Sequence, residues 1–91
     1  MTEIETLVEN VSLLYTGLER TGIRAIDALS STAPELVDEL LATFESRDRA
    51  ANWLVRRMVA FSGFCALEML SQGEREPVMS ILHIVRDGLR A

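Results

Sequence analysis

The sequence has one cysteine, no lysine, two prolines and no apolar run close to the length that crosses a bilayer. A single cysteine excludes a disulfide framework and any metal site built from several thiolates. A membrane-spanning helix needs roughly 20 apolar residues in succession, which no segment provides. The first residues, Met1–Glu5, lack the basic stretch and apolar run of a signal peptide. We therefore expect a reduced, cytoplasmic protein that has no membrane partner.

The 91 residues suffice for one small domain, and 48% of them are apolar, which is enough to build a core. Charge is divided unevenly along the chain. Residues 1–45 carry nine acidic residues against two arginines, whereas residues 46–91 carry seven arginines against five acidic residues. Domains that bind phosphate backbones are usually basic, so the acidic first half disfavours a nucleic acid partner. We expect a single helical domain over residues 1–91, with an acidic part (1–43) and a second part (44–91).

Apolar residues recur at helical spacing in every long segment, and no segment alternates with the period of two that is typical of strands. The first of these stripes predicts a long amphipathic helix near the N-terminus. Further helices are expected from about residue 34, from residues 46–48 and from about residue 77. The predicted fold class is all-α, a small single-domain bundle of four or five helices. The apolar stripe of the first helix consists of Ile4, Leu7, Val8, Val11, Leu14, Tyr15 and Leu18.

Two local signals bear on where the first helix ends and the second begins. Gly17 and Gly22 weaken the first helix, so the pattern leaves open whether it runs on to Leu29 or a short second helix starts. Thr32, two residues before Pro34, predicts a threonine cap for the following helix.

Few residues have the chemistry of a catalytic or metal site. His83 is the only histidine, and its one nearby carboxylate at helical spacing is Asp87, with which we expect a loose pair. Cys65 lies among apolar residues and is expected to be a small core residue. Glu74 and Glu76 flank a helix start, where the helix dipole favours acidic side chains. We therefore predict a protein that is not an enzyme, holds no metal or cofactor, and works by binding another protein.

Eleven residues between positions 44 and 88 follow one pattern without a gap: Phe44, Ala50, Trp53, Leu54, Gly63, Leu67, Leu70, Gly73, Val78, Leu82 and Gly88. In this respect residues 44–91 resemble the C-terminal toxin-binding domain of the Xre/ParS/MbcA group of bacterial antitoxins. This chain has Arg57-Met58 where that family has Pro-Asn, and Ala66 where it has a further proline. Because prolines would break a helix there, their absence predicts one longer helix from about residue 48 into the sixties.

The resemblance implies neutralisation of a RES-type toxin, an enzyme that consumes NAD, by covering the entrance to its active site with the C-terminal helices. The residues that would contact the toxin are Arg86, Gly88, Leu89, Arg90 and Ala91. The family's usual N-terminal helix-turn-helix is not evident in residues 1–43. The predicted core anchors of the second half are Trp53, Leu54, Leu67, Leu70, Val78 and Leu82.

Two other functions stay open beside antitoxin-like binding. In the first, the chain is a self-associating helical adaptor, a homodimer whose stripe from Ile4 to Leu18 packs against its own copy, as small helical chains often need a partner to complete a core. In the second, the chain is a DNA-binding transcriptional regulator, which the acidic balance disfavours.

Overall fold

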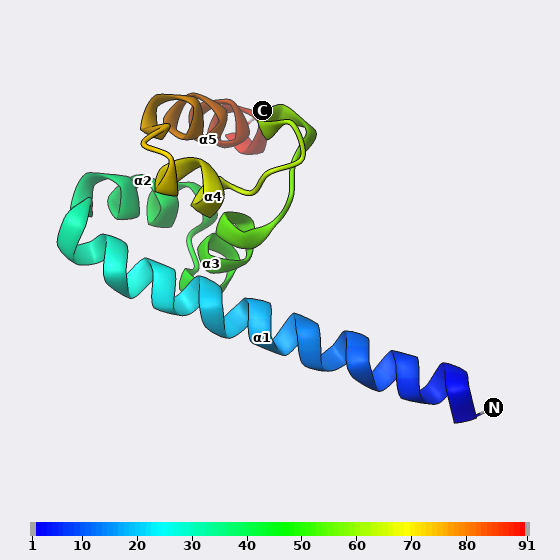
Figure 1. The fold of residues 1–91 in the computed structure, drawn as a ribbon. Helices are drawn as coiled ribbons and strands as arrows, with labels where there is room; N and C mark the ends of the chain where they lie inside the picture. Colours follow the sequence, from blue (N-terminus) through cyan, green and yellow to red (C-terminus); the bar gives the residue numbers. More distant parts are fainter. Residues whose placement is uncertain (1, 91) are drawn as a thin grey trace.

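The computed structural model describes residues 2–90, with side chains up to residue 89. Within this range the chain forms five α-helices and one 3₁₀ helix and no strand, which confirms the predicted all-α bundle (Figure 1). The only β-type pairing there is an isolated bridge between Arg57 and Cys65. The elements are α1 (Thr2–Thr32), α2 (Pro34–Phe44), α3 (Arg47–Val55), the 3₁₀ helix η1 (Val59–Phe61), α4 (Ala66–Ser71) and α5 (Arg75–Arg90).

The core lies between α2, α3, α5 and the C-terminal end of α1. We call these elements, together with α4, the body. Its largest fully buried side chains are Leu36, Leu40, Leu54, Val78 and Leu82. Burying one such side chain contributes about 1.5–3 kcal/mol, so these helices hold one another in place. Four of the predicted core anchors, Trp53, Leu54, Val78 and Leu82, are buried, and Leu67 and Leu70 are partly buried against them.

Helices α1 and α3 pack closely and run in opposite directions. Arg47 at the start of α3 forms an ion pair with Asp27, and Ala51, one turn later, lies against Gly22. A Cβ atom on Gly22 would lie 2.5 Å from the carbonyl oxygen of Ala51, so only glycine allows the two backbones this approach. The first helix therefore continues unbroken through Gly22, and its glycine serves packing rather than termination.

The predicted long helix from residue 48 into the sixties is wrong. Helix α3 ends at Val55, and Arg56 takes an extended conformation. Residues 56–65, which we call the 56–65 loop, turn back on themselves, with the amide of Met58 donating to the carbonyl of Phe64 at 3.0 Å. Ser62 and Gly63 have positive φ values of 56° and 89°, a conformation that a continuing helix excludes.

The predicted threonine cap of the second helix is also wrong. Ala33 occupies the cap position of α2 and no side chain caps it, although Pro34 stands in the first turn as expected. The hydroxyl of Thr32 instead donates to the carbonyl oxygen of Ala28 within α1, at 3.3 Å. The long first helix extends far enough to use Thr32 as its own last residue.

Candidate functional site

The first two thirds of α1 leave the body and project as a helical arm (Figure 1). Every residue from 2 to 21 is exposed, whereas Gly22, Ala25 and Ile26 are buried. The projection lengthens the molecule to 47 Å along one axis, against 30 and 25 Å along the others. We call residues 2–21 the arm.

The arm exposes the apolar stripe that the sequence predicts. Its seven residues, the arm stripe, are Ile4, Leu7, Val8, Val11, Leu14, Tyr15 and Leu18. At about 100° per residue, all seven fall within a sector of about 120° that also contains Gly22, Ala25, Ile26 and Leu29. The face that α3 covers at one end of α1 is therefore the same face that stays open along the arm.

An exposed helix of this composition is not expected to be stable by itself. Ten of the arm's 20 residues are poor helix formers: seven are β-branched and the others are Asn10, Ser12 and Gly17. Isolated helices are marginal below about 12–15 residues even when rich in alanine, and most helical stability comes from packing an apolar face. A surface that covers the stripe would therefore stabilise the arm.

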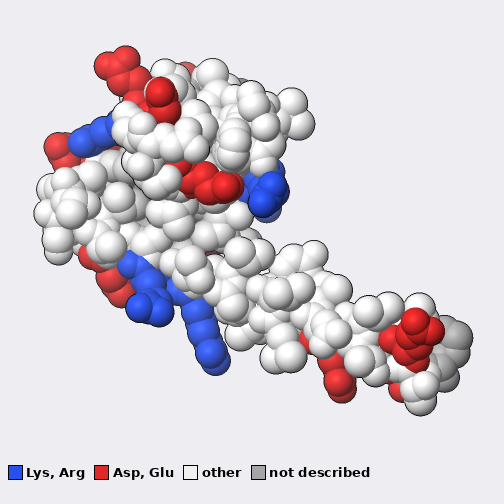
Figure 2. All heavy atoms as spheres, in the orientation of Figure 1, with Lys and Arg blue, Asp and Glu red and all other residues white. Residues whose placement is uncertain are grey.

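The rest of the arm surface is polar and mainly acidic. Glu3, Glu5 and Glu9 lie outside the stripe sector, and Leu13 is the one large apolar side chain on the opposite face. Figure 2 shows acidic side chains at the tip and lower edge of the arm, while the upper edge between body and tip carries none. The uncharged edge lies on the side from which α3 packs (Figure 1).

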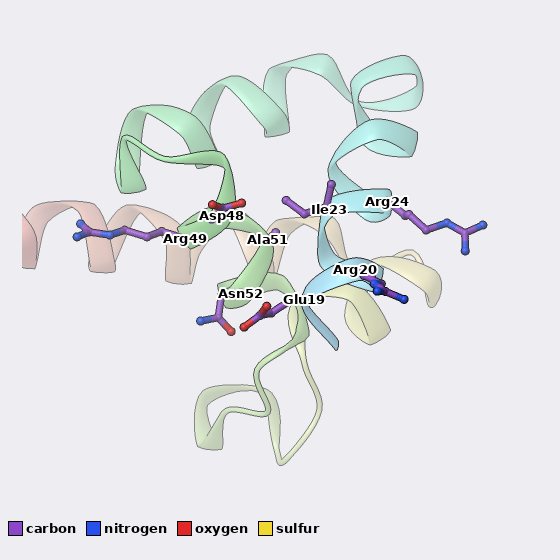
Figure 3. A pocket seen from close by; sticks show the side chains of 8 residues that line it. All are labelled: Glu19, Arg20, Ile23, Arg24, Asp48, Arg49, Ala51 and Asn52. Carbon is purple, nitrogen blue, oxygen red and sulfur yellow. The ribbon is translucent and has the colours of Figure 1, made fainter. Parts of the chain in front are cut away.

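A groove of 620 Å³ lies between α1 and α3, next to the point where the arm begins. Ile23 and Ala51 lie between the two helices, and charged side chains form the rim. Figure 3 shows Arg24 and Arg49 pointing away from each other and from the groove. These two arginines therefore do not converge on the groove.

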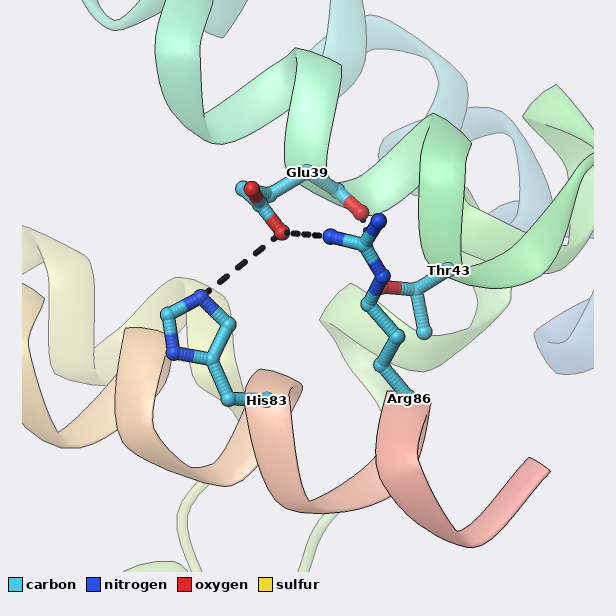
Figure 4. A network of polar contacts seen from close by, with 4 residues as sticks. All are labelled: Glu39, Thr43, His83 and Arg86. Atoms are coloured by element: carbon cyan, nitrogen blue, oxygen red, sulfur yellow. Dashed lines mark hydrogen bonds and ion pairs between the residues drawn. The ribbon is translucent and has the colours of Figure 1, made fainter. Parts of the chain in front are cut away.

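Glu39 on α2 joins two side chains of α5 (Figure 4). Its Oε2 accepts a hydrogen bond from Nη1 of Arg86 at 2.9 Å and lies 3.7 Å from Nε2 of His83. The predicted partner of His83 was Asp87, but the carboxylate that lies beside its ring is that of Glu39. Less than a third of the Glu39 and Arg86 side chains is exposed, so this pair fastens α5 to α2.

The residues predicted to contact a toxin differ in their exposure to solvent. Arg86 points inward to Glu39 and is only partly exposed. Gly88 and Leu89 are exposed on the last turn of α5, where 65% of Leu89 is accessible. The side chain of Arg90 and the whole of Ala91 lie outside the described residues.

The 56–65 loop presents apolar surface that the helical pattern did not reveal. Val59 is 97% exposed and Phe64 is exposed as well, whereas Phe61 is buried against Trp53. The Ser62-Gly63 pair was the available sequence signal, because glycine marks positions with positive φ. Cys65, at the end of this loop, is buried, as expected for a small core residue.

Residues 2–90 bring no three His, Cys, Asp or Glu side chains together as a metal site requires. None of the helices in that range is both long and apolar enough to cross a bilayer. No protein-family model, no curated protein and no solved structure is similar to this chain.

Proposed function

We propose that this protein is a protein-binding module that self-associates, with the arm stripe as its binding surface. The observation that carries the proposal is the continuity of one apolar face along α1, covered by the body at residues 22–29 and uncovered over the whole arm. Apolar surface of this extent, bordered by polar residues, marks interaction sites in proteins that are otherwise well packed.

A second copy of the chain fits this surface better than a lipid membrane does. Helices that lie on membranes carry lysine and arginine on the polar face, which attracts them to anionic lipids. The polar face of the arm instead carries Glu3, Glu5, Glu9 and Glu19 against Arg20 alone. Another arm supplies an apolar stripe of the same length, and closed dimers built from one self-complementary patch are the commonest assembly of soluble proteins.

Adjacent leucines on opposite faces provide the test. Leu14 lies in the arm stripe and Leu13 on the far side, and their exposed fractions are nearly equal, 68% and 70%. Leu14→Glu should lower the molar mass in solution from dimer to monomer and reduce the helical signal in circular dichroism, because an uncovered arm frays. Leu13→Glu, the matched control, should leave both measurements unchanged.

Sedimentation equilibrium over a range of protein concentrations measures the mass directly. A wild-type chain that stays monomeric up to about 100 μM contradicts the proposal. A dissociation constant of that size corresponds to a weak binding free energy of about 5–6 kcal/mol. Equal effects of the two substitutions would also contradict it, since they would show that the stripe has no special role.

The antitoxin-like role that the resemblance implies stays a prediction. Exposed Leu89 is consistent with a contact at the end of α5, but Arg86 would have to leave Glu39 before it could contact a toxin. A chain truncated after Asp87 tests this role, because it should lose the ability to neutralise a RES-type toxin while keeping its helical content.

A further inference from the structure

The arm stripe has the same spacing in both directions from Val11. Val8 and Leu14 stand three residues away on either side, Leu7 and Tyr15 four residues away, and Ile4 and Leu18 seven residues away. We propose that two copies pair their arms antiparallel, about a twofold axis that passes beside Val11. The proposal rests on the self-association proposed above and specifies its geometry. Each apolar residue of one stripe then faces an apolar residue of the other.

The length of the arm fits the space that α3 leaves open. In this register, residue 4 of one copy faces residue 18 of the other, so the partner helix begins next to the last turn of α3, which follows Ala51 towards the arm. Because α3 runs opposite to its own α1, the partner's α1 runs in the same direction as α3. The partner helix therefore continues the cover that α3 starts, along one uninterrupted face of α1.

A parallel pair of arms is blocked by the bodies. Packed helix axes lie about 8–10 Å apart, and a helix with its side chains is about 10–12 Å wide. In a parallel pair, the two α3 helices would both have to fit between the two α1 helices, starting at Gly22. The α1 axes would then have to separate by roughly two helix widths within about one turn after Leu18, which a continuous helix does not allow.

Charge favours the same arrangement. A parallel pair places Glu3, Glu5 and Glu9 of one copy beside the same residues of the other. The antiparallel register moves the two Glu3 positions 16 residues apart along the pair, about 24 Å, which is beyond the screening length at physiological salt. Each Glu3 then lies level with Glu19 of the other copy, so one acidic neighbour remains at each end. It also brings the acidic tip of each arm to the end of the partner's α3, where Arg56 and Arg57 are exposed.

Disulfide formation between single-cysteine proteins tests the orientation. The full chain carries Cys65→Ala, so that the only thiol is the one introduced, and retention of the helical signal is checked for each protein. Ile4→Cys and Leu18→Cys are prepared separately with different tags, then mixed or kept apart and oxidised mildly. We expect covalent dimers only in the mixture, where residue 4 of one copy meets residue 18 of the other. Leu13→Cys, on the opposite face, is the control and should give none.

The outcomes separate this inference from the self-association on which it rests. Covalent dimers from Ile4→Cys alone and from Leu18→Cys alone would overturn the antiparallel register and retain pairing through the stripe. A dimeric mass with no disulfide in any combination would overturn the register as well. A monomeric mass for the protein before any substitution would overturn both proposals.

Discussion

The two parts of α1 have the same apolar pattern and opposite surroundings. From Gly22 to Leu29 the apolar face is packed into the body, with α3 against it at Gly22, and from Ile4 to Leu18 it is open. The angular position of the stripe does not change at the boundary, although its residues become smaller at Gly22 and Ala25. What changes is the presence of α3, which ends at Val55 and leaves the rest of the face without a neighbour.

This difference shows how an amphipathic pattern should be interpreted. The pattern specifies that a face will be covered, but it does not specify whether the cover comes from the same chain. In the C-terminal part of α1 the cover is intramolecular, and glycine at position 22 brings it close. In the arm we infer that the cover is a second copy, so the same physical requirement becomes a binding function.

The largest effect is expected from removing an aromatic ring of the body. Trp53 is 5% exposed and packs against Phe44 and Phe61, with ring centroids 5.7 and 6.3 Å away. Trp53→Ala should lower the free energy of unfolding by about 3–5 kcal/mol, because it leaves a cavity. Tyr15→Ala, an aromatic truncation in the arm, should change the free energy of unfolding by less than about 1 kcal/mol when the protein is dilute enough to be monomeric. Urea denaturation of both variants measures the contrast, and equal losses would show that the arm is part of the core.

Smaller effects are expected at the two glycines of α1, where alanine should lower stability at one position and raise it at the other. Gly22→Ala should destabilise the protein by about 1–3 kcal/mol, because the added methyl group meets the backbone of Ala51 and must push α3 away. Gly17→Ala adds a methyl group with nothing within 4 Å, and should raise helix stability by about 0.5–1 kcal/mol.

Thermal unfolding of the two alanine variants, side by side, measures this pair. A stabilising Gly22→Ala would contradict the close packing of α1 on α3. A destabilising Gly17→Ala would indicate that a partner approaches the far side of the arm, rather than its stripe.

The smallest effect is a pH dependence at the start of α4. The carboxylate of Glu68 accepts a hydrogen bond from the amide of Cys65 at 3.0 Å, which lowers the pKa of Glu68. Since the folded-state pKa lies below the unfolded value near 4.5, the stabilisation is complete above pH 4.5 and is lost as the pH falls through the folded-state pKa. Glu68→Gln should therefore differ from wild type in melting temperature at pH 6, and the difference should shrink towards pH 3. Glu9→Gln, in the arm, is the control, and an equal response there would contradict a local cause.

Much of the fold could be predicted from the sequence, because helical spacing is a strong signal over long segments. The all-α class, the stripe from Ile4 to Leu18 and the start of α3 next to Ser46 all follow from local patterns. The continuity of α1 could not be predicted, since glycine disfavours a helix by about 1 kcal/mol unless packing compensates. That compensation is the contact between Gly22 and Ala51, and it depends on residues nearly 30 positions apart.

The 56–65 loop shows where local patterns mislead. Ala50, Trp53, Leu54, Met58 and Phe61 have helical spacing, yet the helix stops at Val55 and Phe61 reaches the core from η1. The amide of Met58 pairs with the carbonyl of Phe64 instead of continuing the helix. A spacing compatible with a helix is equally compatible with a turn that brings the same side chains back to the core. Exposure of the arm could not be predicted from local patterns either, because it depends on where α3 ends.

Because α1 runs from the arm into the body as one helix, the rotation of the arm about the helix axis relative to the body is fixed. A force or torque applied to the tip is carried by the continuous helix from Thr2 directly to the Gly22–Ala51 contact. Inserting one residue after Leu18 would rotate the seven arm-stripe side chains by about 100° relative to the body without changing one of them. The orientation of whatever the arm holds is thus set by the count of residues between Leu18 and Gly22.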